Sequence, residues 1–288
     1  MTDFRFRDPK RPVAKNIKSS VREMIRAARS PRSAFRALPD FMIIGAQKAG
    51  TTSLFHYLEE CPDVRGPLTK EVHFYDHNVD RGEQWYRSNF PIRAATDDWI
   101  TGESSPYYLL HPGVPRRLAD HLPGTRLIAL LRHPVQRAYS HFNHSRVLGG
   151  EPIADFETAL AAEAERTDEA WARLVKTGKR EPAVEWFSYA RRSYYAPQLR
   201  RWLACFPRES LLIMTAEELY QDPEGGLSQA RTHLGLPQMD VTHRNYRPRN
   251  ARSYLPISDE VRRELSRGFV DDMAEVEQLI GRPTGWDL

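Results

Sequence analysis

Two glycines, a lysine and two threonines follow an apolar run near the N-terminus, and their spacing predicts an anion-binding site. The run ends in Gly45-Ala-Gln-Lys-Ala-Gly50, with Thr51 and Thr52 next. Glycine lets a backbone turn tightly and approach a ligand, and the free N–H groups at the start of a helix attract a phosphate. Because Lys48 adds a positive charge inside the loop, we expect the loop to bind a phosphate.

The position of the lysine distinguishes this loop from the usual nucleoside-triphosphate loop. A Walker A motif places Lys and then Ser/Thr directly after the second glycine. Here Thr51 follows Gly50, and Lys48 lies two positions before that glycine. We therefore expect a phosphate site of a different kind.

A second set of candidates lies in an alternating segment of polar and apolar residues. Glu71, His73 and Tyr75 would share one face if this segment is an extended strand. An acid, an imidazole and a phenol side by side could act in proton transfer. A solvated strand face is the simpler alternative.

A third candidate follows a second apolar run, residues 125–131. Pro134 suits the first turn of a helix, so Arg132 would lie at the carboxyl end of a strand. Open α/β sheets bind ligands at that edge. Ser140 lies two helical turns further on. Arg132 is either a ligand contact or a structural partner for a carboxylate.

Apolar strand segments alternate with helical segments, which predicts an α/β fold: a single domain with a central parallel sheet flanked by helices. The strands are expected at about 41–46, 125–131 and 210–215, and within residues 99–108, where a strand runs into a polar turn. The helices are expected at about 51–60, 82–90, 111–121, 157–173, 193–206, 217–220, 223–234 and 258–280.

Composition divides the chain into a basic arm, residues 1–38, and a domain, residues 39–288. Residues 149–190 are charged, alanine-rich and without strand signals, so we expect a helical cap over a substrate cleft. Trp186 and Phe187 are candidates to line that cleft, although such aromatic residues also pack in cores.

The chain of 288 residues is 40% hydrophobic, enough for a sizeable core. No apolar run approaches the roughly 20 residues of a membrane span, and the N-terminus lacks the apolar segment of a signal peptide. We therefore expect a cytoplasmic protein. Cys61 and Cys205 are isolated, which favours reduced structural thiols over a disulfide or a metal site.

The arm carries eleven basic and three acidic residues, a net charge of +8 in a chain whose total is +4. An apolar set at helical spacing predicts a short amphipathic helix: Ile17, Val21, Met24, Ile25 and Ala28. Two interpretations remain open. The helix is either a solvated element laid over the domain or a weak contact to a membrane surface or an acidic partner. No nucleic-acid partner is expected.

A basic loop interleaved with tyrosines occupies residues 242–254. Arginines suit phosphate and an aromatic face suits a base, so Arg249, Arg252 and Tyr254 are candidates for nucleotide binding. A solvated connection is the alternative.

Together these residues resemble the sulfotransferases that use 3′-phosphoadenosine 5′-phosphosulfate (PAPS), in the branch of the heparan sulfate enzymes and their bacterial relatives. Gly45–Leu54 resembles the 5′-phosphosulfate loop of that family, and Arg132–Ser140 resembles its 3′-phosphate motif. The resemblance implies a sheet related to nucleotide kinases and a donor bound by three groups of residues. These are Gln47, Lys48, Ala49, Gly50, Thr51, Thr52 and Ser53 in the loop, Arg132 and Ser140, and Arg249, Arg252 and Tyr254 in the basic loop. The basic loop lacks the Lys-Gly-Phe pattern of the family.

A third segment, residues 70–76, is similar to the Lys-Glu-Pro-His-Phe-Phe-Asp segment of the glycan branch. The resemblance implies that Glu71 is the general base and His73 an orienting or substitute base. Lys70 and Asp76 would contact the substrate, and Val72 replaces the proline. Residues 103–106 resemble a Glu-Lys-Thr-Pro segment whose lysine helps hold the substrate. Ser104 removes that charge, which counts against a polyanionic glycan.

The function expected is transfer of a sulfuryl group from PAPS, leaving PAP (3′-phosphoadenosine 5′-phosphate), to a hydroxyl or amine. The acceptor would be a small molecule, a glycolipid or a saccharide, and no metal is required. Two alternatives remain: a small-molecule kinase, and a nucleotide-binding regulatory protein without catalysis.

Overall fold

The computed structural model describes residues 13–240, 246–247 and 256–287. Its sheet has five parallel strands in the order β2-β3-β1-β4-β5, which confirms the predicted α/β fold. The strands are β1 (Phe41–Gly45), β2 (Val64–Arg65), β3 (Ile100–Ser104), β4 (Arg126–Leu131) and β5 (Leu211–Thr215). The two-residue strand β2 was not predicted.

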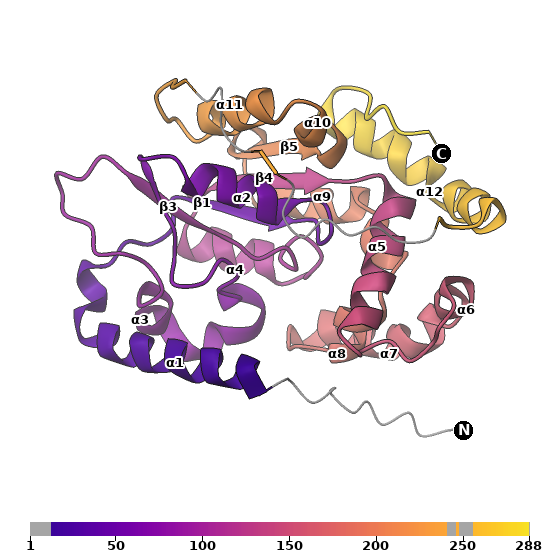
Figure 1. The fold of residues 1–288 in the computed structure, drawn as a ribbon, viewed down its shortest axis with the longest axis horizontal. Coiled ribbons are helices and arrows are strands. Elements are labelled where there is room, and N and C mark those ends of the chain that lie inside the picture. The colour runs from indigo at the N-terminus through magenta and orange to yellow at the C-terminus, as the bar shows by residue number, and fades with distance from the viewer. Residues whose placement is uncertain (1–12, 241–245, 248–255, 288) are drawn as a thin grey trace.

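Twelve α-helices of the described residues surround this sheet (Figure 1). They are α1 (Val13–Arg29), α2 (Thr51–Glu59), α3 (Gly82–Arg87), α4 (Val114–His121), α5 (Pro134–Val147), α6 (Phe156–Ala161), α7 (Glu163–Thr177), α8 (Pro182–Phe187), α9 (Ala196–Leu203), α10 (Ala216–Gln221), α11 (Pro223–His233) and α12 (Asp259–Ile280).

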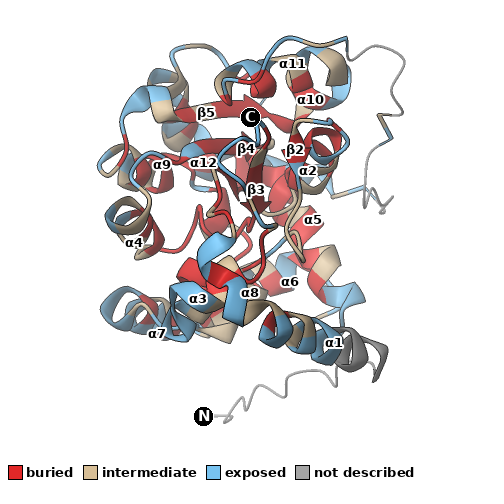
Figure 2. Cartoon of the chain, turned by 90° about the vertical axis from the view of Figure 1, so that its left-hand side faces the viewer, coloured by how far each residue is buried: buried red, intermediate tan, exposed pale blue. Residues whose placement is uncertain are grey.

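The central strands are buried on both faces, as their unbroken apolar sequences require. All five residues of β1 are buried, and so are all residues of β4 except Arg126. Figure 2 shows the strands as the buried centre, with exposed surfaces on the outer sides of the helices. Ile43 of β1 pairs with Ser104 of β3 and with Ile128 of β4. Parallel pairing brings the loops after these three strands to one edge of the sheet.

Helices from the N-terminal part and from the middle of the chain extend below this sheet. In Figure 1, α1 and α3 lie below the sheet together with the cap helices α6, α7 and α8, while α10 and α11 lie beside β5. The loop edge of the sheet therefore faces elements from the arm on one side and from the cap on the other.

The helix expected over 157–173 is two helices, α6 and α7, which meet at Ala162. Glu163, the first residue of α7, accepts hydrogen bonds from the amides of Ala190 and Arg191 at 2.7 and 2.9 Å. These bonds tie α7 to the far end of the cap. The helix expected from residue 193 starts later, at Ala196, after a 3-10 turn.

Neither Cys61 nor Cys205 is part of a disulfide, and the buried Cys61 donates from Sγ to the carbonyl of Tyr57 at 3.4 Å. In the described part of the chain, every helix is too short or too polar to cross a membrane.

Candidate active site

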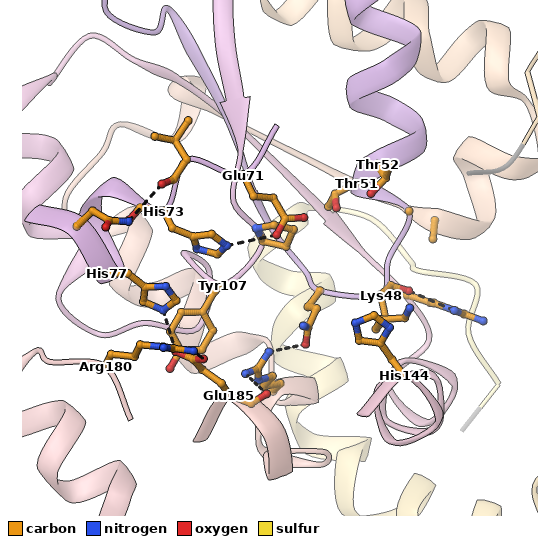
Figure 3. Close-up of a pocket in the computed structure, with 18 of the residues that line it drawn as sticks. Lys48, Thr51, Thr52, Glu71, His73, His77, Tyr107, His144, Arg180 and Glu185 are labelled. Carbon is orange, nitrogen blue, oxygen red and sulfur yellow. Dashed lines mark hydrogen bonds and ion pairs between the residues drawn. The ribbon is translucent and has the colours of Figure 1, made fainter. Parts of the chain in front are cut away.

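The loop between β1 and α2 curls over a cavity of about 1270 Å³ (Figure 3). Gly50 directly precedes α2 with φ 92°, and a Cβ there would lie 2.5 Å from the hydroxyl of Tyr220. Only glycine fits this position without strain. The intrahelical bonds of α2 begin with the Ser53 amide on the Gly50 carbonyl, so the earlier amides lie at the open N-terminus. The predicted anion cradle is therefore present.

Five of the predicted loop residues line the cavity, and two do not. The cavity-lining residues are Gln47, Lys48, Gly50, Thr51 and Thr52. Ala49 is fully buried in the core, and the buried Ser53 uses its amide within the helix. The structure therefore gives no support to a direct ligand contact by Ala49 or Ser53.

Arg132 follows β4 and reaches the same loop, as its place at the strand end predicted. Its Nη1 donates to the carbonyl of Lys48 at 3.2 Å, and its side chain lines the cavity. Ser140, two turns into α5, is 5% exposed and does not line the cavity. The structure brings one member of the predicted pair to the site.

The segment predicted to be an extended strand is irregular, so the shared face of Glu71, His73 and Tyr75 was wrong. His73 has φ 54°, and a π-helical turn, Phe74–Asn78, follows it. This turn sends Tyr75 into the core, where its hydroxyl hydrogen-bonds Nδ1 of His121 at 2.8 Å. Glu71 and His73 remain together at the cavity. A left-handed residue here could not be read from an alternating pattern.

Glu71 lies between two cations and next to the cradle (Figure 3). Lys70 Nζ is 3.0 Å from the Glu71 carboxylate and donates to Thr52 Oγ1 at 3.1 Å. Nε2 of His73 is 3.3 Å from the other carboxylate oxygen. Burial raises the pKa of Glu71, but the hydrogen bond from His73 and the charge of Lys70 outweigh burial and lower the pKa to about 2. Glu71 is therefore ionised at neutral pH.

His73 is held from behind by a buried carboxylate. Asp76, 3% exposed, accepts a hydrogen bond from His73 Nδ1 at 2.8 Å and does not line the cavity. Burial lowers the pKa of His73, but the carboxylates of Asp76 and Glu71 outweigh burial and raise it well above 6.5. Asp76 thus orients His73, and the structure does not place it at the substrate, as the sequence interpretation did.

This arrangement predicts that His73 is an imidazolium at pH 7. Since its pKa is raised above 6.5, its contribution to stability is fully present below pH 6.5 and is lost as the pH rises through the folded-state value. NMR titration of the imidazole nitrogens, assigned with His73→Gln, should show both nitrogens protonated at pH 7, and Asp76→Asn should lower that pKa. A neutral His73 at pH 7 would contradict the assignment.

His73, Asp76 and His77 bring three metal-ligating atoms within 4.8 Å of one another, a grouping that sequence reasoning missed. A doubly protonated imidazole has no lone pair for a metal. Since Asp76 and Glu71 both favour the imidazolium form of His73, ion pairing accounts for the cluster.

Glu103, at the end of β3, fixes the backbone of this segment. Its fully buried carboxylate accepts hydrogen bonds from the Val72 amide at 3.2 Å and from the hydroxyls of Ser105, Tyr86 and Tyr108 at 2.6, 2.6 and 3.1 Å. Ser104, the predicted substrate contact, is fully buried and does not line the cavity. Glu103 is a structural support that the sequence did not reveal.

The opposite wall comes from α8 and the turn after it. Glu185 of the cap bonds His77 Nε2 at 2.8 Å and pairs with Arg180 at 2.7 Å. Arg192, 4% exposed, donates to the side chain of Gln47 and lies over the ring of Tyr107, 4.9 Å from its centroid. These six residues line the cavity, and Gln47 is the one among them that was predicted. Sequence reasoning missed the other five because the pairs described here, apart from Arg180–Glu185, join residues more than thirty positions apart.

Comparison with known proteins identifies this architecture. The sequence matches the sulfotransferase domain over residues 38–268. The chain belongs to the sulfotransferase family. It is 30% identical to heparan sulfate glucosamine 3-O-sulfotransferase 6 of Mus musculus over 275 residues, 88% of this chain and 75% of that relative. It is also 30% identical to the 3B1 enzyme of Homo sapiens, over 90% of this chain and 69% of the relative.

A solved structure shows the same fold for the whole domain. A sulfotransferase from Alicyclobacillus acidocaldarius superposes with a TM-score of 0.66 at 29% identity, over 88% of this chain and 98% of that one. The predicted family, fold and enzyme class are therefore confirmed, and the kinase alternative is not supported.

Two aromatic candidates lie outside the cavity of this sulfotransferase. Phe187 is 3% exposed and packs in the core with the Arg166 guanidinium over its ring at 4.3 Å. Trp186 packs partly buried against Gly150. Neither lines the cavity, so their predicted role at the substrate has no structural support. Arg249, Arg252 and Tyr254 lie outside the described residues.

The arm contributes a further wall that sequence reasoning did not assign to the site. Glu23 and Arg26 of α1 line the cavity of the sulfotransferase together with Arg81 and Trp85. The guanidinium groups of Arg26 and Arg81 lie 5.0 and 4.6 Å from the Trp85 ring centroid, and Glu23 pairs with both. This wall and the cap wall enclose the space beside Glu71.

Proposed function

We propose that this sulfotransferase transfers a sulfuryl group from PAPS to a hydroxyl or amine, with Glu71 as general base and Lys48 stabilising the leaving phosphate. One observation carries the proposal: Lys70 joins Glu71 to Thr52 in the first turn of α2. A carboxylate and a phosphate cradle are thus linked through a single side chain. A reacting hydroxyl beside Glu71 would lie next to a ligand in the cradle.

The residues present fit the donor. The N-terminus of α2 favours an anion, and Gly50 leaves room where a Cβ would collide with Tyr220. Lys48 and Arg132 add positive charge on the same side. Cavities of about 300–1000 Å³ hold typical ligands, so about 1270 Å³ can hold a nucleotide and part of an acceptor.

The donor supplies a sulfuryl group attached to a phosphate that leaves as negative charge develops on it. Lys48 and the first amides of α2 would stabilise that charge from fixed positions, which costs no reorganisation during the reaction. Arg132 and Ser140 remain our candidates for the 3′-phosphate, by resemblance. Lys70, between Glu71 and Thr52, would fix the position of the Glu71 carboxylate relative to the anion cradle.

A pKa of about 2 decides how Glu71 can act. A carboxylate of that pKa is a weak base toward a neutral hydroxyl, whose own pKa is far higher. In a loose transition state the hydroxyl becomes acidic only as its bond to sulfur forms. Glu71 would therefore accept the proton late, and His73 would keep the carboxylate aimed at the acceptor.

The relatives and the residues of the cap both favour an acceptor that carries a sugar. The matched relatives are named for glucosamine in heparan sulfate, which favours a saccharide. The ion pairs of Glu185 with His77 and Arg180 offer polar contacts to such a molecule. A small molecule or a glycolipid carrying a sugar would present the same chemistry.

A ligand-binding measurement tests this proposal. PAP should raise the melting temperature of the protein, whereas ATP with Mg²⁺ should have a much smaller effect. At a PAP concentration of 100 times Kd, the expected stabilisation is about 2.7 kcal/mol. Labelled PAPS offered with a panel of saccharides and extracts should then give a labelled product. A protein that PAP does not stabilise would not be a PAPS-dependent enzyme, and one that binds PAP without turnover would support the regulatory alternative.

A further inference from the structure

The arm helix α1 is oriented with a polar face toward the domain. Arg26, 8% exposed, donates from Nε to Asn89 at 2.7 Å. Glu23 pairs with Arg81 at 2.8 Å. Because these contacts come from a charged residue in each of two successive turns, they fix the rotation of the helix about its axis.

The apolar face of α1 therefore points to solvent. Met24 is 72% exposed and Val21 is 47% exposed, and Ala28, one turn further, is also exposed. Helices on the surface of soluble domains usually bury this face. Figure 2 shows α1 at the edge of the molecule with its exposed side turned outward. Three of the five residues of the predicted stripe are therefore exposed, and Ile25 is partly buried.

The charge of the helix is positive beside this face. The sequence of α1 contains five basic residues and one acid. Glu23 and one of the basic residues, Arg26, are paired with each other on the inner side, which leaves four basic residues and no acid for the rest of the helix. Arg22 is exposed. After the helix, the charges of Arg29 and Arg32 add to burial in lowering the pKa of Arg36. An excess of positive charge at this end of the chain attracts anions.

We propose that α1 docks on an anionic lipid surface, with Met24 and Val21 inserted among the headgroups and the neighbouring arginines on the lipid phosphates. An exposed apolar stripe flanked by cations is the pattern of helices that lie in a membrane interface. Nucleic acid would use the cations but leave the stripe in water. The contact is peripheral, since α1 is not long and apolar enough to cross a membrane.

Co-sedimentation of the full chain with vesicles tests the proposal. The protein should bind vesicles containing phosphatidylserine and not those of phosphatidylcholine alone, and added salt should release it. The double variant Val21→Glu/Met24→Glu should bind at least about tenfold more weakly. The matched control is Val175→Glu/Val270→Glu, which changes two apolar residues that are 55% and 50% exposed on α7 and α12. It should bind like the wild-type chain.

The outcomes of these binding experiments either support or contradict the docking of α1 on anionic lipid. Equal loss in both double variants, or no binding to anionic vesicles, would overturn the proposal. So would a wild-type dimer that Val21→Glu/Met24→Glu dissociates without changing vesicle binding, because the face would then belong to a second copy. Circular dichroism melting of both variants confirms that they fold. Vesicle binding without stabilisation by PAP would leave docking standing and remove the proposed function.

Discussion

Lys48→Met is expected to lower kcat about 10²–10³-fold, the effect of removing one preorganised group that stabilises developing charge. Lys48 lines the cavity in the loop before α2, where the leaving phosphate would lie. Its φ of 74° is left-handed, and methionine is also a non-glycine residue, so the substitution keeps the same backbone strain. The loss should therefore report the missing charge.

The measurement is kcat with labelled PAPS, together with the Kd of PAP by calorimetry. Affinity for PAP should fall less than kcat, because the charge matters most in the transition state. Lys176→Met, on the exposed surface of α7, is the control and should behave as wild type. If kcat of Lys48→Met stayed within about threefold of wild type, Lys48 would have no role in the chemical step.

Glu71→Gln should lower turnover by about 10²–10⁴-fold while PAP binds normally, as expected for loss of a general base. Glutamine is isosteric and can still accept hydrogen bonds from Lys70 and His73, so the segment should keep its geometry. Because the pKa of Glu71 is about 2, the wild-type rate should show no loss from its protonation between about pH 5 and pH 8.

A matched substitution on the surface separates the loss of the general base from the loss of one negative charge. Glu169→Gln removes a carboxylate that is 96% exposed on α7, and its kcat should match wild type. Undiminished turnover by Glu71→Gln would transfer the base role to another group. Weakened PAP binding in that variant would show instead that Glu71 contributes to binding of the nucleotide in the anion cradle.

The sheet and its loop edge could be predicted from the sequence because local patterns determine them. Continuous apolar runs mark β1 and β4, and Gly50 and Pro134 mark the helix starts that follow. Because β1 and β4 are parallel, the segments that follow them, which carry Lys48 and Arg132, lie at the same edge of the sheet. Family motifs added Glu71 and His73, which the structure places at the same cavity.

The remaining features depend on contacts between distant segments. In the sequence, Tyr75 has the spacing from Glu71 that an extended strand requires. The left-handed backbone conformation of His73 instead directs Tyr75 into the core. The wall formed by Arg192 and Gln47 joins residues 145 positions apart. The apolar stripe of α1 was visible in the sequence, but its direction was set by Arg26 and Asn89, a pair 63 positions apart.

The two faces of α1 have a thermodynamic consequence. Glu23 and Arg26 line the cavity on one side of the helix, while Met24 meets solvent on the other. If a molecule bound in the cavity changes the position of α1, it also changes the affinity of the outer face of α1 for its binding partner by some factor. Reciprocity then requires the outer contact to change affinity in the cavity by the same factor. Titrating either site in the presence of the other would therefore measure a single coupling free energy.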